Sequence, residues 1–197
     1  RFQSEYAENL LHAERGHDAE VFLEGKVKSA NPDPRLLHLY GRALMKTGKM
    51  REAAHALKRA RLLNPFNIDR LISLGTALTS LGQHRDAAEA YGRAIELDKK
   101  NPQAIEGKGQ ALLLSGDINS ALSFLKAMST NVEMASIFNS AGIFCIHEKK
   151  YAEARELYMV AGKALKDDKP VLAKVSFNLG LAYLRMNRTL AAGYYFQ

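Results

Sequence analysis

An internal repeat runs along the whole chain and constrains its fold more than any other feature. Five glycines recur at intervals of 34, 34, 33 and 38, and five alanines recur at the same intervals. The glycines are Gly41, Gly75, Gly109, Gly142 and Gly180, and the alanines are Ala53, Ala87, Ala121, Ala154 and Ala192. A fixed period of this length indicates an array in which one small structural unit stacks on the next.

Inside each unit, the apolar residues have helical spacing. The first series lies at positions i, i+3, i+4 and i+7, as in Leu37, Tyr40, Gly41 and Leu44, which is one face of a helix. A second series follows in each unit, and a further glycine lies between the two series: Gly48, Gly82 and Gly116. Glycine at that place is typical of a left-handed residue that ends a helix. Each unit is therefore predicted to be a pair of antiparallel helices.

This pattern resembles the tetratricopeptide repeat, whose signature over one period is W-x2-L-G-x2-Y…A-x3-F…P. In the second clear unit, the two halves read Leu71-x2-Leu74-Gly75-x2-Leu78 and Ala87-x3-Tyr91. The resemblance covers essentially the whole chain. It implies an all-α, right-handed superhelical solenoid of antiparallel helix pairs with about six tetratricopeptide repeats.

The predicted repeats form a single solenoid domain over residues 1–197. The leading repeat is degenerate, a four-residue insert lengthens the helices around the fourth-to-fifth junction of the clear repeats, and the last repeat is truncated. The boundaries are 1–33, 34–67, 68–101, 102–134, 135–172 with the insert, and 173–197. The chain does not begin with methionine, and it ends inside a helical pattern, so we expect a fragment of a longer protein. The ending Tyr-Phe-Gln is either native or an engineered remnant. The native reading is favoured because Phe196 is in phase with the repeat.

Composition narrows the class of protein. Hydrophobic residues make up 47% and charged residues 25%, which is typical of globular proteins. No run approaches the roughly 18 apolar residues that span a bilayer, so membrane insertion is not expected. The chain has 1 cysteine, which cannot form an internal disulfide, and a cytoplasmic location is predicted.

The search for reactive groups finds no catalytic, cofactor or metal site. Gly41 to Lys49 lacks the spacing and the following Ser or Thr of a phosphate-binding loop. Cys145 and His147 are two positions apart on a predicted helix, and their side chains therefore point about 200° apart. Cys145 instead occupies the apolar position that Leu44 holds in its repeat. We expect a protein that is not an enzyme and binds no cofactor.

The resemblance implies that the first helix of each pair lines a concave groove that binds a peptide or helix of a partner protein. The predicted groove residues lie beside the packing stripe of these helices. They are Arg35, His38, Arg42, Lys46, Thr76, Thr79, Gln110, Asn139, Ile143 and Asn178. Together with Ile146 and Leu181, this set changes from basic through polar to apolar. The predicted ligand is therefore acidic and then hydrophobic along its length.

The net charge of +7 leaves other partners open. A basic run, Lys49, Arg51, Lys58, Arg59 and Arg61, lies in a predicted second helix. Glu52 interrupts it and no aromatic residues interleave to stack bases, so a solvated face is favoured and nucleic acid is disfavoured.

The primary prediction is an interaction scaffold, whose repeats resemble those of bacterial signalling, secretion and pilus-assembly proteins. One alternative is an assembly module that associates with its own copies, for which the truncated C-terminal end is a candidate surface. The second alternative is an RNA-binding helical-repeat protein.

Overall fold

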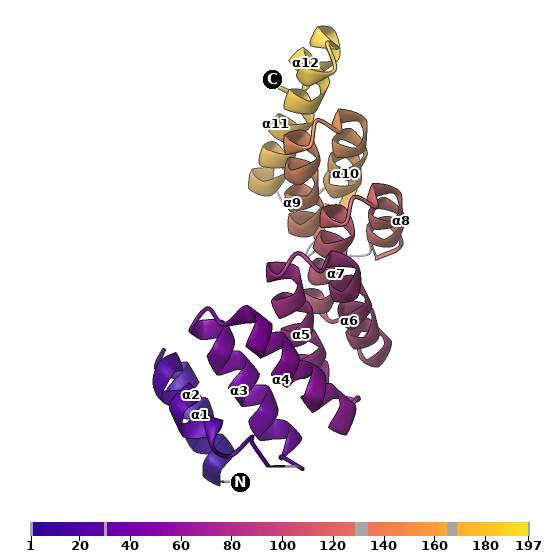
Figure 1. The fold of residues 1–197 in the computed structure, drawn as a ribbon. Helices are drawn as coiled ribbons and strands as arrows, with labels where there is room; N and C mark the ends of the chain where they lie inside the picture. Colours follow the sequence, from indigo (N-terminus) through magenta and orange to yellow (C-terminus); the bar gives the residue numbers. More distant parts are fainter. Residues whose placement is uncertain (1, 30, 129–133, 165–168, 197) are drawn as a thin grey trace. The chain divides into compact units, whose positions relative to one another are not determined.

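The structure, a computed structural model, describes residues 2–29, 31–128, 134–164 and 169–196. The chain divides into two compact units, residues 1–111 and 112–197, whose described elements are α-helices (Figure 1). The first unit contains α1 (Phe2–His12), α2 (Gly16–Glu24), α3 (Pro34–Lys46), α4 (Met50–Leu63), α5 (Ile68–Ser80), α6 (His84–Leu97) and most of α7 (Pro102–Leu114). The second contains α8 (Ile118–Met128), α9 (Met134–His147), α10 (Tyr151–Ala164), α11 (Lys169–Arg185) and α12 (Thr189–Tyr195).

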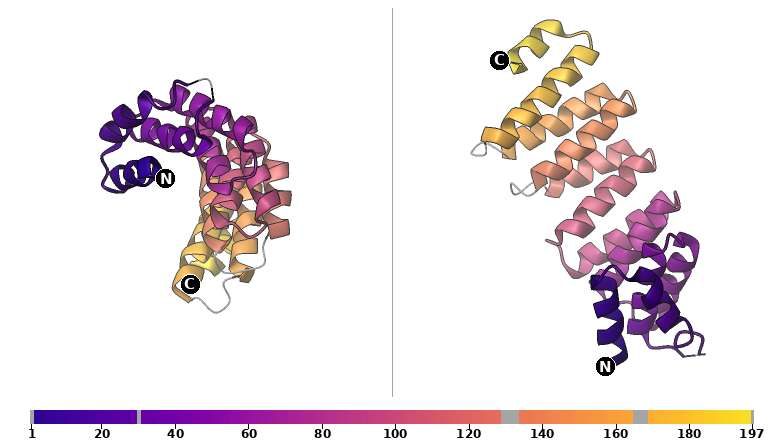
Figure 2. Two further views of the ribbon diagram at one scale, coloured as in Figure 1. Left: turned by 90° about the horizontal axis from the view of Figure 1, so that it is seen from below. Right: turned by 90° about the vertical axis from the view of Figure 1, so that its left-hand side faces the viewer.

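From α1 to α6 in the first unit, and from α9 to α12 in the second, consecutive helices run antiparallel and pack on one another (Figure 2). In the first unit, α3 contacts α4 and also α1 and α5, which are the first helices of the adjacent pairs. In the second unit, α9 contacts α10 and α11 in the same manner. The predicted helix pairs are therefore present in both units, while the repeat boundaries and the single solenoid domain stay predictions.

Short polar side chains begin the first helices. The Asp33 carboxylate accepts a hydrogen bond from the backbone N–H of Arg35 at 2.7 Å, and Pro34 follows as the first residue of α3. Asn67 caps α5 by accepting from the backbone N–H of Arg70 at 2.9 Å. These caps satisfy backbone donors that have no partner inside the helix, and they fix where each first helix starts.

The turn inside each pair contains a left-handed residue. Gly48, Gly82 and Gly116 have φ angles of 80°, 74° and 82°, as the sequence predicted. Lys149 and Asn187 occupy the corresponding place in the later pairs, with φ of 59° and 58°. Because a side chain makes this conformation unfavourable by about 1–2 kcal/mol, the turn geometry is dictated by helix packing and not by the local residue.

The recurring small residues form the interior of each pair. The five predicted alanines are all buried, and so are the five predicted glycines. At several of these glycines the space is filled by a side chain of the helix that follows. A Cβ atom on Gly41 would lie 2.6 Å from Leu57, one on Gly75 2.7 Å from Tyr91, and one on Gly142 2.5 Å from Tyr158. The glycines thus make room for a large side chain of the second helix.

The helix that follows the four-residue insert is longer than the first helices of the first unit. α11 has 17 residues, whereas α3, α5 and α7 have 13 each. α10 has 14 residues, the same as α4 and α6. Residues 165–168, which follow α10, lie outside the described residues, so the expected lengthening of α10 stays a prediction. Asp167 and Asp168, which the insert contains, lie outside the described residues.

Candidate functional site

The first helices of the first unit surround a hollow of about 590 Å³, here called the inner hollow. Its lining comes from α1, α3, α5 and the start of α7. The residues are Ser4, Glu5, Glu8, Arg35, His38, Leu39, Arg42, Asn67, Asp69, Arg70, Ile72, Ser73 and Gln103. First helices therefore line a hollow within this unit, while a binding groove along all the repeats stays a prediction.

Three of the four predicted basic groove residues meet at the inner hollow: Arg35, His38 and Arg42. Neither the Arg35 nor the Arg42 guanidinium has an ion-pair partner among the residues that the structure describes. A third arginine, Arg70, is only 3% exposed. Its guanidinium donates to the Asn64 carbonyl at 2.6 Å, while its Nε has no partner in the described part of the chain.

His38 lies in the wall of the inner hollow, where its Nε2 is 3.1 Å from Ser73 Oγ. Burial lowers the pKa of His38 to about 4, and the nearby Arg70 and Arg42 act on this pKa in the same direction. A histidine with this pKa is neutral near pH 7. The positive charge of the hollow therefore comes from arginine at that pH.

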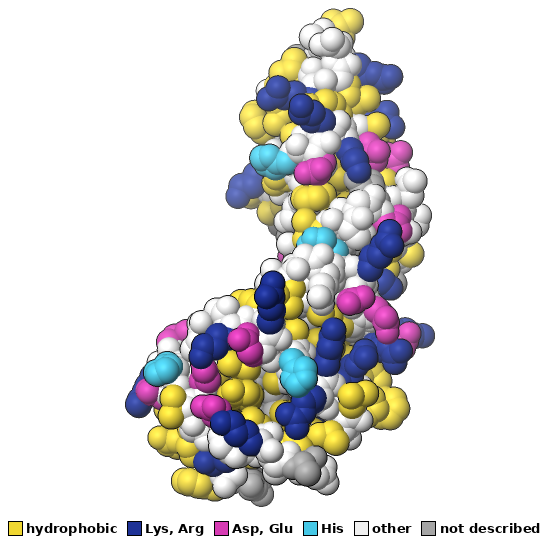
Figure 3. All heavy atoms as spheres, in the orientation of Figure 1, with side chains coloured by type: hydrophobic (Ala, Val, Ile, Leu, Met, Phe, Trp, Pro, Cys, Tyr) yellow, Lys and Arg dark blue, Asp and Glu magenta, His cyan; other side chains and the backbone are white. Residues whose placement is uncertain are grey.

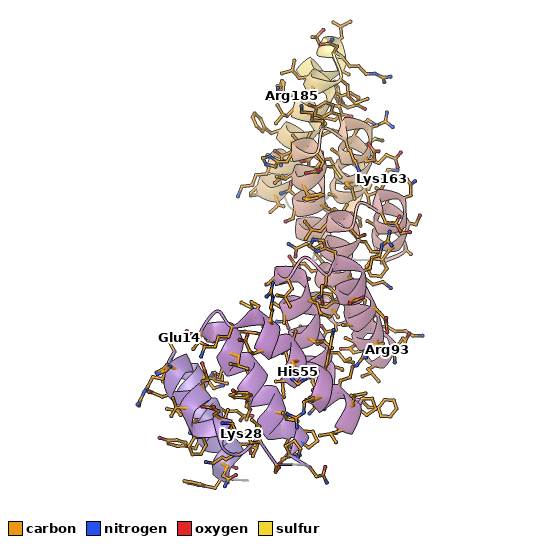
Figure 4. The ribbon with its side chains drawn as sticks, viewed as in Figure 1. Glu14, Lys28, His55, Arg93, Lys163 and Arg185 are labelled. Atoms are coloured by element: carbon orange, nitrogen blue, oxygen red, sulfur yellow. The ribbon has the colours of Figure 1, made fainter. Side chains whose placement is uncertain are left out.

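Lys46 is not in the lining of the inner hollow. As the last residue of α3, it lies beside the turn between α1 and α2, where its Nζ is 2.5 Å from Glu14 Oε2. Glu14 is labelled at this turn in Figure 4. The two residues are distant in the sequence, so the helical spacing within α3 could not indicate that Lys46 pairs with Glu14. That spacing placed Lys46 with Arg35, His38 and Arg42 instead.

Sequence reasoning missed the acidic side of the inner hollow. Glu5 and Glu8 of α1 and Asp69 of α5 also line it. The lining of the hollow thus contains three acidic residues as well as three arginines. The repeat period could have indicated the two residues of α1. Glu5 lies one period before Leu39 and Glu8 one period before Arg42, and both of these equivalent residues line the inner hollow.

The predicted groove residues of α5 and α7 lie outside the lining of the inner hollow. Thr76 Oγ1 is 3.0 Å from the Tyr91 hydroxyl and also donates to the carbonyl of Ile72. Thr79 Oγ1 donates to the carbonyl of Gly75 at 2.9 Å. Gln110 is exposed on α7. The hydroxyls of the two threonines are thus engaged within their own helix pair.

The second unit has a hollow of about 560 Å³, called the apolar hollow because Ile143, Ile146 and Leu181 line it. The remaining lining residues are His147, Lys149, Tyr151, Tyr158, Asn178 and Arg185. Asn178 Nδ2 donates to Asn139 Oδ1 at 2.8 Å, which joins α11 to α9. Here the structure brings the predicted Ile143 and Asn178 together and places Asn139 beside them.

Among the described residues, no group of three His, Cys, Asp or Glu side chains is arranged to hold a metal ion. Cys145 is fully buried, as its place in the apolar series predicted, and burial raises the pKa of its thiol to about 11. Within the same described ranges, no helix combines the length and the apolar character needed to cross a membrane.

Comparison with known proteins places this geometry in a class. Residues 34–67 match the family described as "Tetratricopeptide repeat", and residues 75–116 match that described as "TPR repeat". A search of curated proteins by sequence found no significant match.

Many solved structures are similar in fold. The crystal structure of MamA has 22% identity and a TM-score of 0.64, over 83% of this chain and 87% of that one. The crystal structure of YrrB, described as a TPR protein with an unusual peptide-binding site, has 22% identity and a TM-score of 0.66, over 87% and 89%. A tetratricopeptide repeat protein from Parabacteroides merdae ATCC 43184 has 17% identity and a TM-score of 0.67, over 98% and 75%.

The stacked helix pairs and the solved relatives define an all-α helical-repeat protein of the solenoid class, which confirms the predicted fold class. More specifically, residues 34–67 and 75–116 of the chain match repeats of the tetratricopeptide-repeat family. Proteins of this family are interaction scaffolds, and a role in binding other proteins follows.

Proposed function

We propose that this protein is a non-enzymatic scaffold that binds a peptide or helix of a partner protein along its first helices. The observation that carries the proposal is the inner hollow, where Arg35 and Arg42 face a concave surface without an ion-pair partner among the described residues. Arginine binds carboxylates through two parallel hydrogen bonds. The similar fold of YrrB, described as having a peptide-binding site, supports a ligand of this class.

The lining of the inner hollow restricts the charge order of such a ligand. Carboxylates on α1 and guanidinium groups on α3 line the same hollow. A bound peptide that places an acidic group at Arg42 and a basic or neutral group at Glu8 satisfies both sides. A uniformly acidic peptide would be repelled by Glu8. The proposed ligand therefore places one acidic group next to α3, in place of the acidic stretch predicted from the sequence.

The apolar hollow of the second unit is proposed as a separate contact for hydrophobic side chains. Ile143, Ile146 and Leu181 offer it apolar surface, and Asn178 offers polar atoms at its edge. The proposal includes a cytoplasmic location, since the one cysteine is a buried thiol, and a bacterial signalling, secretion or pilus-assembly context.

The test is affinity capture with the wild-type chain and two charge-reversal variants, followed by binding measurements on the captured partner. Arg42→Glu should weaken binding by about 1.5–3 kcal/mol, the range for hydrogen bonds to charged groups, and should reduce its salt dependence. Arg93→Glu is the matched control, because Arg93 is exposed on α6 and pairs with Glu89. Equal losses in both variants would indicate attraction by diffuse charge and would reject the inner hollow as the binding site.

Self-association is a second candidate, which the exposed apolar residues of α11 and α12 favour. Leu190 is 94% exposed, and Phe177 and Tyr194 are also largely exposed. Large exposed apolar residues favour association when they are contiguous. Sedimentation at several concentrations tests this, and Leu190→Glu should shift the chain toward monomer. RNA binding is less favoured, because basic and acidic side chains are interspersed on the face of the first unit seen in Figure 3.

A further inference from the structure

A hollow of about 470 Å³ in the first unit, here called the α4 hollow, lies apart from the inner hollow and shares no residue with it. It is lined by Val27, Leu37, Tyr40, Arg51, Glu52, His55, Ala56 and Arg59. Most of these residues come from α3 and α4. His55, on α4, is labelled in Figure 4.

The short length of α2 explains why there is space beside α4. α2 has 9 residues and ends at Glu24, whereas the second helices α4 and α6 have 14 residues each. Val27 therefore follows the end of α2. The equivalent residue one period later is Arg61, which still lies inside α4. The α4 hollow thus occurs where the leading pair departs from the repeat.

Three residues that can carry positive charge line one face of α4 at this hollow. Arg51, His55 and Arg59 are spaced i, i+4 and i+8, which aligns them along the helix. In the part of the chain that the structure describes, neither arginine has an ion-pair or hydrogen-bond partner for its guanidinium. The carboxylate in the lining is Glu52, which also interacts with Lys49.

The next pair gives an internal comparison. The residues one period later are Arg85, Glu89 and Arg93 on α6. There Arg93 Nε is 3.3 Å from Glu89 Oε1, an i, i+4 ion pair on an exposed face. His55 stands where α6 has Glu89, so Arg59 lacks the pairing carboxylate that Arg93 has. Arg51, His55 and Arg59 are here called the basic stripe of α4. It differs from the equivalent exposed face of α6 because it lacks the carboxylate that neutralises an arginine there.

We propose that the α4 hollow binds an acidic segment of a partner protein, with one carboxylate at Arg51 and another at Arg59. Eight residues of helix place these two side chains about 12 Å apart. In an extended segment, two acidic residues four positions apart are separated by about 13 Å. An apolar residue midway between them reaches the apolar part of the lining, Val27 and Tyr40. Tyr40 is the only Phe, Tyr or Trp in this lining, and it is partly buried. Proteins that bind single-stranded nucleic acid stack successive bases on several aromatic side chains, so this lining favours a peptide.

The experiment is fluorescence anisotropy with a labelled peptide, Gly-Ser-Glu-Ser-Leu-Ser-Glu-Ser-Gly, and the whole chain. His55→Glu recreates the α6 pattern and gives Arg59 an internal partner, so it should weaken binding about tenfold, as should Arg59→Glu. The matched variants Glu89→His and Arg93→Glu on α6 should change affinity by less than about twofold. Arg42→Glu, in the inner hollow, should also leave this binding within about twofold, which separates it from the proposed function. Circular dichroism of each variant checks that the helices remain.

Three results would overturn the proposal. One is the absence of saturable binding of the peptide up to about 1 mM, the weakest affinity of interest here. Another is an equal loss of affinity in the α4 and α6 variants, which indicates nonspecific attraction. The third is tighter binding of a twelve-residue oligothymidine than of the peptide, with loss in Arg59→Glu, which indicates a nucleic-acid surface. A version of the peptide with Lys at both Glu positions should not bind.

Discussion

Replacing Gly75 by alanine tests a tight contact between the two helices of a pair. A Cβ atom on Gly75 would lie 2.7 Å from Cζ of Tyr91 and 2.8 Å from both of its Cε atoms. The ring has no room to withdraw, since a Cβ atom on Gly107 of the next helix would lie 2.4 Å from the same ring. Tyr91 is 5% exposed, and its hydroxyl is 3.0 Å from Thr76 Oγ1. The ring is therefore held between two glycines and fixed at its tip.

The magnitude follows from three contributions to the free energy of unfolding. Overpacking costs about 1–3 kcal/mol, and losing the hydrogen bond of Tyr91 costs about 0.5–1.5 kcal/mol. The helix preference of alanine over glycine offsets up to about 1 kcal/mol. Taken together, these contributions mean that Gly75→Ala should destabilise the protein by about 0.5–4.5 kcal/mol. Gly92→Ala is the control, because its Cβ would lie 3.4 Å from the flexible end of Lys108, and it should be neutral or slightly stabilising.

Urea unfolding followed by circular dichroism measures both variants, with attention to the slope because repeat proteins can lose two-state behaviour. A double-mutant cycle with Tyr91→Phe separates the contributions. If Gly75→Ala displaces the ring, then Tyr91→Phe should cost little in that background and about 0.5–1.5 kcal/mol in the wild type. Wild-type stability of Gly75→Ala, or additive losses in the cycle, would refute the reasoning.

Further predictions concern pH and backbone strain. Hydrogen bonding to Lys49 lowers the pKa of the Glu20 carboxyl. The stability that the ionised Glu20 contributes is therefore present above its usual pKa and is lost as the pH falls through its lowered pKa. In Glu20→Gln, the free energy of unfolding should therefore fall less steeply with decreasing pH. His38 has a pKa of about 4 when folded and 6.5 when unfolded, so the protein should lose up to about 3 kcal/mol as the pH falls across that interval. His38→Gln should remove this loss in urea titrations at pH 7 and pH 4.5, and an unchanged pH dependence would contradict it. Lys149→Gly should raise the free energy of unfolding by about 1 kcal/mol, because Lys149 has a positive φ. A lower midpoint in thermal unfolding would contradict that.

The helix pairs could be predicted from the sequence because their determinants recur in phase. The buried alanines and the left-handed glycines follow the period, and each occupies the place that the pattern indicated. Even Lys149 has the predicted backbone conformation of the glycine that it replaces. Packing of one pair on the next imposes this geometry, so a single unfavourable residue does not change it.

The charges of the candidate site could not be predicted in the same way. The helical spacing placed His38 and Lys46 on one face of α3, but their partners come from other helices. His38 meets Ser73 of the following pair, and Lys46 meets Glu14 of the preceding one. A one-dimensional pattern indicates which face of a helix is exposed. It does not give the charge state of a side chain, which depends on burial and on neighbours distant in the sequence.

Binding specificity in a repeat protein has to come from positions that differ between repeats, because the side chains at the shared positions are buried between the packed helices. The first helices illustrate this within the first unit: Glu8, Arg42 and Thr76 are equivalent positions of successive repeats, but each has a different chemistry. The second helices do the same with His55 and Glu89. In both cases the helix is repeated while the side chain is not, so the difference in binding between two such positions reports on the side chain and on the neighbouring helix. Reciprocal exchange, with His55→Glu and Glu89→His in one chain, should therefore remove the basic stripe from α4 and create one on α6. If the acidic peptide then bound at α6 as tightly as it binds α4 in the wild type, the stripe alone would suffice. If it bound neither helix, the hollow left by the short α2 would also be required.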